Sequence, residues 1–249
     1  MTQLQAISQL EAESLAFFDP EAGIYGIADH GNALLFKNGH MLAHSDATVS
    51  IESTGTTSWS ASMTAMKGSF ELVWTAHGPS APLDSAEEMR CIVTGSVTES
   101  GQEPRKIDCL GTATMVSRRP GPPVVRALAA IFDHDNAVLM NGYKPAVYHG
   151  HGDERNDAVL IENGVALPIR ETRISTLYDG NDRHVQAHLE LFVGEDEFPR
   201  RLTGEVIEGA RAELPGREVN LAFYEWRMGP RTGCGFYEIA LATRPRTAA

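Results

Sequence analysis

The chain carries three sequence landmarks twice, in the same order. Each copy has an apolar stretch that ends in aspartate, then an Asn-Gly pair after an apolar run, then a Thr-Gly-x-Val segment. The landmarks lie at residues 15–19, 38–39 and 94–97 in the first copy, and at residues 128–133, 163–164 and 203–206 in the second. The copies are separated by about the length of one ordinary domain, which is far too long for a solenoid repeat. The sequence therefore predicts a tandem duplication, and a site between two similar modules is the first place to look for a ligand.

Period-two alternation of apolar and polar residues predicts β-strands. Residues 70–76 alternate in this way, and the clearest case is 184–193, where apolar residues take one face while His184 and His188 share the other. Asn-Gly, Asp-Gly and Ser-Gly pairs interrupt such runs and are typical of hairpin turns. Many short strands with frequent turns predict an all-β fold built from antiparallel barrels or sandwiches.

A proline-rich segment divides the two copies. Residues 118–123 read Arg-Arg-Pro-Gly-Pro-Pro, and prolines exclude both a helix interior and a central strand. We expect a first module over residues 1–119 and a second over residues 120–249, joined by a semi-rigid connection. The only helical signal is a short amphipathic stretch through Leu4, Ile7, Leu10 and Leu15.

Composition excludes several classes of partner. The 249 residues carry a formal net charge of -12 and show no dense cluster of Lys and Arg, which disfavours nucleic acid and anionic membranes. No apolar run approaches the roughly 20 residues that cross a bilayer, and the first residues lack the pattern of a signal peptide. Three cysteines without CxxC spacing predict neither a disulfide framework nor a zinc finger and favour a cytoplasmic protein. Nothing in the sequence indicates an oligomeric state.

The densest chemical cluster is a predicted hairpin near the end of the chain. A Gly/Pro turn joins two strand-like segments that carry Glu225 and Glu238, each beside large aromatic residues. A carboxyl group in apolar surroundings has a raised pKa, as a general acid working near neutrality requires. The alternative is that Arg227 or Arg231 pairs with a glutamate across the sheet and the aromatic rings fill the core.

The same hairpin carries a family resemblance. Residues 220–227 (Asn-Leu-Ala-Phe-Tyr-Glu-Trp-Arg) and 229–238 (Gly-Pro-Arg-Thr-Gly-Cys-Gly-Phe-Tyr-Glu) resemble the closing motif of the hydroxyneurosporene synthase, or carotenoid hydratase-like, superfamily, and residues 13–19 resemble its opening. The resemblance implies two lipocalin-like β-modules packed together, with an apolar ligand cavity at or near their junction. It also implies hydration or cyclisation of isoprenoid-like substrates. The motif that often closes the first module of the family, Asp-His-Ser-Trp-Gly, is reduced here to Asp108 and Gly111.

These residues suit acid catalysis on a lipophilic substrate. The candidate acids are Glu225, Glu238 and Asp108, and a carbocation formed by protonation of an alkene would need aromatic faces within about 6 Å. Many aromatic residues serve packing alone, and Trp226 is the strongest candidate because it adjoins Glu225. The predicted substrate-binding residues are Trp226, Tyr224, Trp74, Trp59 and Tyr148.

Other chemistries find less support in the sequence. His149, His151 and Asp153, or His184 with His188, match no established spacing of metal ligands, so no metal is predicted. There is no Gly-x-Ser-x-Gly elbow and no phosphate-binding loop, so no cofactor is predicted.

Three functions are compatible with these features. The first is a cofactor-independent hydro-lyase or isomerase, of terpenoid hydratase or cyclase type, that hydrates, isomerises or cyclises a hydrophobic small molecule. The second is a carrier of such a molecule, and the third is a non-catalytic assembly module. The clustering of acids, aromatic residues and glycines on one hairpin favours the enzyme.

Overall fold

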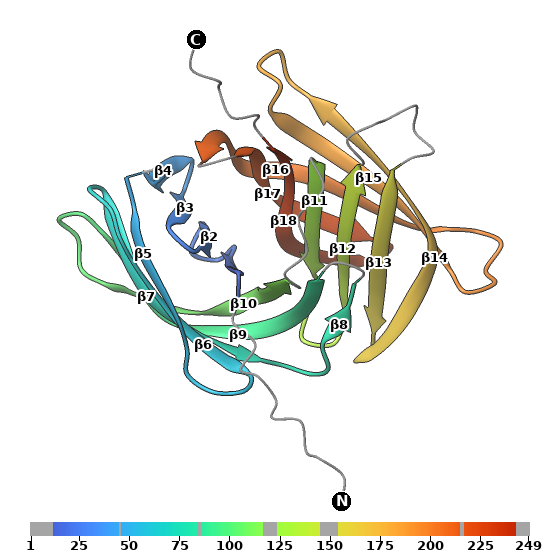
Figure 1. Cartoon of the computed structure of the whole chain (residues 1–249), viewed down its shortest axis with the longest axis horizontal. Coiled ribbons are helices and arrows are strands. Elements are labelled where there is room, and N and C mark those ends of the chain that lie inside the picture. The colour runs from blue at the N-terminus through green and yellow to red at the C-terminus, as the bar shows by residue number, and fades with distance from the viewer. Residues whose placement is uncertain are drawn as a thin grey trace, which may run out of the picture.

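A computed structural model of the chain describes residues 12–44, 46–83, 86–116, 124–144, 154–214 and 217–242. Every regular element in these ranges is a β-strand, and all the strand pairs are antiparallel, which confirms the all-β prediction. The strands form one curled sheet and one closed barrel that lie side by side (Figure 1). No helix of the described ranges is long and apolar enough to span a membrane.

The first module is a half-barrel. Its strands follow the order β4-β3-β2-β1-β10-β9-β7-β6-β5, and β8 pairs with β9 beside this path. The strands are β1 (Ser14–Asp19), β2 (Ile24–Asp29), β3 (Asn32–Lys37), β4 (His40–Ala43), β5 (Thr48–Ser53), β6 (Ser58–Thr64), β7 (Gly68–Ala76), β8 (Ala81–Pro82), β9 (Ala86–Glu99) and β10 (Arg105–Val116).

The second module is a closed barrel in which each strand pairs with the next and β18 returns to β11. The strands are β11 (Val124–Ile131), β12 (Ala137–Lys144), β13 (Arg155–Glu162), β14 (Val165–Tyr178), β15 (His184–Val193), β16 (Arg200–Leu214), β17 (Arg217–Met228) and β18 (Arg231–Ala242). Closure removes the exposed sheet edges and gives the barrel an inner and an outer face.

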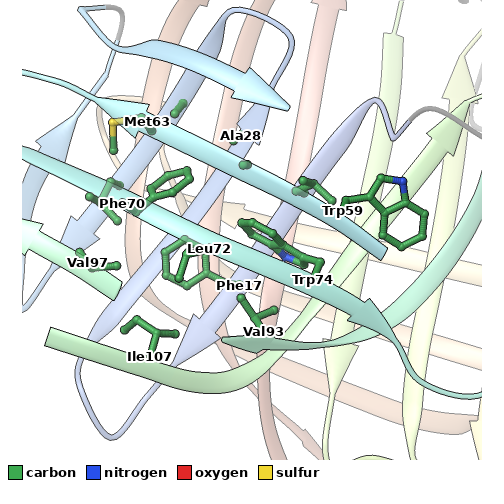
Figure 2. Packing of buried hydrophobic residues seen from close by; sticks show 14 of the residues in the cluster. Phe17, Ala28, Trp59, Met63, Phe70, Leu72, Trp74, Val93, Val97 and Ile107 are labelled. Atoms are coloured by element: carbon green, nitrogen blue, oxygen red, sulfur yellow. The ribbon is translucent and has the colours of Figure 1, made fainter. Parts of the chain in front are cut away.

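The concave face of the first module holds a packed apolar core. Phe70, Leu72 and Trp74 alternate along β7 with more exposed residues, as the sequence predicts. Figure 2 shows their side chains on the same side of the sheet as Phe17 of β1. The rings of Phe17 and Trp74 meet edge to face at 6.2 Å, which is a favourable arrangement for aromatic pairs.

A second core joins the two modules. Phe18 and Tyr25, on the outer face of the first sheet, contact Phe223 on the outer face of the barrel, with ring centroids 6.2 and 5.6 Å apart. Phe36 and Phe236 belong to the same buried cluster. The modules therefore share an apolar interface, with β2 and β3 beside β17 and β18 (Figure 1).

Two of the three repeated landmarks occupy equivalent positions. The apolar stretches form β1 and β11, and each Asn-Gly pair makes a turn between the third and fourth strands of its module, with positive φ at Asn38 and Asn163. The third landmark is not equivalent. Gly95 lies on β9, next to the closing strand β10, whereas Gly204 lies on β16, two strands from β18. A short Thr-Gly-x-Val match recurs easily in β-proteins and does not identify a strand.

The predicted division between residues 119 and 120 falls between β10, which ends at Val116, and β11, which begins at Val124 and belongs to the other sheet. The boundary itself stays a prediction because residues 117–123 lie outside the described ranges. The predicted helix falls mostly on residues 1–11, which are also outside them, while Leu15 lies in β1.

Candidate functional site

The hairpin that the sequence predicts is present as β17 and β18, joined at Gly229 and Pro230. Because side chains alternate along a strand of a barrel wall, Tyr224 and Trp226 point into the barrel while Phe223 and Glu225 point out. The carboxylate of Glu225 is about half exposed and lies 2.6 Å from Nη2 of Arg227. Arg227 therefore pairs with Glu225 on the outer surface of the barrel, but along β17 and not across the hairpin, as the alternative supposed.

The other two predicted acids also lie outside the barrel. Glu238 shares the outer face with Phe236, near an ion pair between Arg217 of the barrel and Asp29 of the first module. Burial raises the pKa of the Glu238 carboxyl, and the nearby Arg217 opposes the shift. Asp108 is exposed on β10. The structure does not bring these three acids together, and their catalytic roles stay predictions.

The predicted aromatic residues divide between the modules. Trp59 and Trp74 are buried in the core of the first module, where Nε1 of Trp74 donates a hydrogen bond to the carbonyl oxygen of Ala16 (2.8 Å). Tyr224 and Trp226 lie in the interior of the second, with their rings stacked at 4.7 Å. Tyr148 lies outside the described residues.

A polar cluster lies inside the second barrel, within an otherwise apolar interior. Oη of Tyr237 accepts hydrogen bonds from Nη1 of Arg126 (2.9 Å) and from Oγ1 of Thr176 (3.3 Å). Nε of Arg126 in turn lies 2.7 Å from a carboxylate oxygen of Glu154, and both side chains of this ion pair are largely buried. This polar cluster lies at one end of the barrel. Arg126 and Glu154 are at or beside the starts of β11 and β13, Thr176 is near the end of β14, and the antiparallel pairing brings these strand ends together.

His184 joins this cluster through an irregularity in the sheet. Leu177 pairs with Gln186, but Tyr178 pairs with His184, so Val185 is an extra residue on β15. This bulge leaves Val185 47% exposed and turns His184, 5% exposed, inward. The prediction that His184 and His188 share one face of the strand is wrong, because simple alternation assumes an unbroken register.

The His184 ring stacks on Tyr237 with centroids 4.9 Å apart and lies 6.4 Å from the Tyr224 ring. Burial, assisted by the charge of Arg126, lowers the pKa of His184 to about 4. The imidazole is therefore neutral near pH 7, so one ring nitrogen can donate a hydrogen bond and the other can accept one. Burial also raises the pKa of Tyr237 to about 12, which keeps its phenol protonated.

Several buried polar atoms inside the barrel have no hydrogen-bond partner among the residues that the structure describes. They are Oη of Tyr224, Nε1 of Trp226, both ring nitrogens of His184, Oγ1 of Thr172 and Oδ1 of Asn156. Each such atom costs about 1–3 kcal/mol if nothing pairs with it. Water or a ligand that supplied the missing partners would remove this cost, so the unpartnered atoms mark the interior of the second barrel as the candidate site.

Gly204 on β16 is part of the architecture of this site. It pairs directly with Trp226, and a Cβ built on it would lie 2.4 Å from Cε3 of the indole ring. The indole ring therefore lies flat over Gly204. The backbone of Gly204 is not left-handed, so glycine is required here only because a side chain would collide with the ring.

Sequence reasoning missed most of this site. Arg126 and Glu154 stand at or beside the ends of apolar strands, where a charged residue is typical of a solvated edge. The inward position of His184 depends on the bulge. From the sequence, Tyr237 is one of eight aromatic residues that could face a ligand, and only closure of the barrel separates it from the adjacent Glu238.

A second titratable group was also missed. Glu88 on β9 is 4% exposed, and Oγ1 of Thr114 donates to both of its carboxyl oxygens (2.9 and 3.0 Å). Burial raises the pKa of Glu88 to about 8. Close by, Arg90 and Thr112 also have buried polar atoms without partners, and Arg90 donates to the carbonyl oxygen of His134 in the second module. The group forms a polar part of the junction between the modules.

No protein-family model matches the chain, and no curated protein matches it either. Twelve chains of solved structures resemble it. Kievitone hydratase from Nectria haematococca is 11% identical, with a TM-score of 0.61 over 92% of this chain and 84% of that one. A protein from Nitrosomonas europaea provisionally assigned as AttH is 12% identical, with a TM-score of 0.55 over 93% of this chain and 80% of that one. At these identities the likeness establishes a shared two-module fold.

Proposed function

We propose that the chain is a cofactor-independent enzyme that adds water to, or removes water from, a largely apolar small molecule inside the second barrel. The observation that carries the proposal is a cluster of four rings with unpartnered polar atoms in an otherwise apolar interior. Trp226 stacks on Tyr224, His184 stacks on Tyr237, and a tilted contact between Tyr224 and His184 joins the two pairs. A kievitone hydratase among the structural neighbours means that this fold supports such chemistry in another protein. Fold likeness adds only an analogy to the argument from the site.

Tyr237 is suited to donate a proton. Its oxygen already accepts hydrogen bonds from Arg126 and Thr176, so the phenolic hydrogen is free to point toward a ligand. The positive charge of Arg126 would stabilise the phenolate left after proton donation, and Glu154 holds that guanidinium in place.

His184 is suited to accept a proton. A neutral imidazole can take a proton from water as the water attacks a substrate carbon, and its ring lies directly against Tyr237. The two rings are stacked and share no hydrogen bond, so a water molecule between them would return the proton after each turnover. This arrangement replaces the carboxylic acid that the sequence predicts with a phenol and an imidazole.

A carrier would use the same unpartnered atoms without using their proton chemistry, so turnover decides between the two functions. The test incubates the protein in H₂¹⁸O with geraniol, a prenylated phenol and an unsaturated ketone, and follows ¹⁸O incorporation by mass spectrometry. Tyr237→Phe should lower incorporation by about 100-fold or more, because it removes the proton and keeps the ring.

Tyr25→Phe is the matched control. It removes a phenol from the junction core and should leave turnover close to that of the parent. Binding of these compounds without any ¹⁸O incorporation would favour the carrier, and equal turnover by the parent and Tyr237→Phe would exclude Tyr237 as the acid.

A further inference from the structure

The polar atoms inside the barrel also restrict the kind of molecule that fits there. An indole Nε1 can only donate a hydrogen bond, and the buried Nε1 of Trp226 has no acceptor among the described residues. Oη of Tyr224 is equally buried and unpartnered there, and its ring lies against the indole with an angle of 19° between the planes. An acceptor such as a carbonyl oxygen would satisfy the indole and could also accept a hydrogen bond from the Tyr224 hydroxyl.

The acids available in the barrel point to the same restriction. The carboxylate of Glu154 is paired with Arg126, and the unpartnered polar groups around the aromatic rings belong to a phenol, an indole, a hydroxyl, an amide and a neutral imidazole. Such weak acids do not protonate an isolated alkene, which requires a strong acid to form a carbocation. They can protonate an enolate, which is a far stronger base than an alkene.

We propose that the substrate is an α,β-unsaturated carbonyl compound, whose carbonyl oxygen accepts hydrogen bonds from Trp226 and Tyr224 while its double bond lies toward His184 and Tyr237. This inference rests on the proposed function and names its substrate class. It is narrower than the isoprenoid-like substrate that the sequence resemblance implies, since a substrate without an oxygen acceptor would leave Trp226 and Tyr224 without partners.

The reaction balances with these groups alone. Water forms a C–O bond at the β-carbon, and its proton passes to His184. The π electrons move to the carbonyl oxygen, where Trp226 and Tyr224 stabilise the enolate as hydrogen-bond donors. Tyr237 then gives its proton to the α-carbon, and the imidazolium returns a proton to the phenolate. The sum is the addition of one water molecule, and the reverse sequence removes it.

The spacing of the rings suits this arrangement. Tyr224 lies 6.4 Å from both His184 and Tyr237, measured between ring centroids, while Trp226 lies on the other side of Tyr224. A conjugated carbonyl group places its oxygen and its β-carbon at opposite ends of a short planar unit. Such a unit can reach the donors at one end and the acid–base pair at the other.

The test compares two probes that differ only in the oxygen. Trans-4-phenyl-3-buten-2-one is the ketone, and trans-1-phenyl-1-butene is the hydrocarbon in which a CH₂ group replaces the carbonyl. Affinity is measured by titration calorimetry, and infrared spectroscopy of the bound ketone reports hydrogen bonding as a lowered carbonyl stretching frequency. We expect the ketone to bind about tenfold or more tightly than the hydrocarbon, because the hydrocarbon leaves buried donors unpaired.

Two variants locate the effect. Tyr224→Phe removes one hydroxyl with little change of shape, and Trp226→Phe removes the indole donor. Each should weaken binding of the ketone by about tenfold, leave binding of the hydrocarbon nearly unchanged and reduce the infrared shift. If Trp226→Phe does not fold, Tyr224→Phe alone still tests whether the ketone accepts a hydrogen bond here, because it removes a single hydroxyl.

Equal affinity for the two probes, or a preference that neither variant reduces, would overturn the assignment and mean that water satisfies these donors. The outcome is separate from that of the proposed function. If the protein binds the ketone preferentially but does not hydrate it, the proposed ligand class stands and the proposed enzymatic function is wrong. If it hydrates simple alkenes and shows no preference for the ketone, the enzymatic function stands and the ligand class is wrong.

Discussion

Neighbouring residues of this chain face opposite sides of one barrel wall, and that position decides their chemistry. Glu225 stands between Tyr224 and Trp226 in the sequence, yet its carboxylate is half exposed and paired with Arg227, whereas both of its neighbours are fully buried. A carboxylate in that position is open to solvent, is paired with a cation and cannot reach a ligand held inside the barrel. By contrast, burial raises the pKa of the Glu88 carboxyl, and only the hydrogen bond from Thr114 opposes the shift.

Glu88 should make the stability of the protein depend on pH. Its pKa is about 8 in the folded state against an ordinary value of 4.5, so the protonated form is favoured in the fold. The contribution of the protonated Glu88 carboxyl to the free energy of unfolding is therefore fully present below about pH 4.5 and is lost as the pH rises toward 8. At pH 8, Glu88→Gln should therefore unfold at a higher urea concentration than the parent, because its free energy of unfolding should be about 2 kcal/mol larger. The difference in free energy should be smaller at pH 4.

Glu87→Gln is the control for this measurement, since Glu87 is the adjacent residue of β9 and is less deeply buried. A loss of stability in Glu88→Gln at pH 8 would mean that the carboxylate is ionised and usefully bonded in the fold.

At the scale of elements, strand pairs build the site. The sequence predicts the β17–β18 hairpin well, because its turn residues and aromatic alternation are local features. It does not predict the bulge at Val185, since an extra residue on one strand shows only against the partner strand. The face of His184 was therefore assigned wrongly, while the strand that carries it was assigned correctly.

The pairing of Gly204 with Trp226 across β16 and β17 gives a test at this scale. Gly204→Ala places a methyl group where the indole ring lies, so the ring must move. We expect a loss of about 1–3 kcal/mol in the free energy of unfolding and a shift in Trp226 fluorescence. Affinity for an enone probe should fall as well, since Nε1 moves with the ring.

Gly180→Ala provides the matched control, because a Cβ at Gly180 would meet no atom within 4 Å. If both variants unfold at the same urea concentration with the same fluorescence spectrum, the ring does not depend on the glycine.

At the scale of the whole molecule, the two modules are joined by an aromatic core that belongs to neither interior. Phe223 contacts Phe18, Tyr25 and Phe36 of the first module, although it stands on the outer wall of the second. Interfaces that are apolar and closely packed usually make adjoining modules unfold together.

Phe223→Ala should therefore lower the free energy of unfolding by about 3–5 kcal/mol, although the residue is outside the barrel interior. Unfolding in urea, followed by tryptophan fluorescence, should show one transition in the parent because Trp59 and Trp74 report on the first module and Trp226 on the second. Phe198→Ala, at a side chain 79% exposed, should change little. Two separate transitions in the parent would contradict the coupling of the modules.

Local sequence patterns were sufficient to predict the all-β fold, the strands at residues 70–76 and 184–193 and the hairpin near the end of the chain, because alternation and turn residues act between near neighbours. Which face of each strand became the interior depended on contacts between distant parts of the chain. Closure of the second barrel turned Tyr224, Trp226 and Tyr237 inward and left Glu225 and Glu238 outside, and the bulge added His184. A strand with apolar residues on both faces carries no local sign of which side will be enclosed, since that depends on pairing between strands far apart in the sequence.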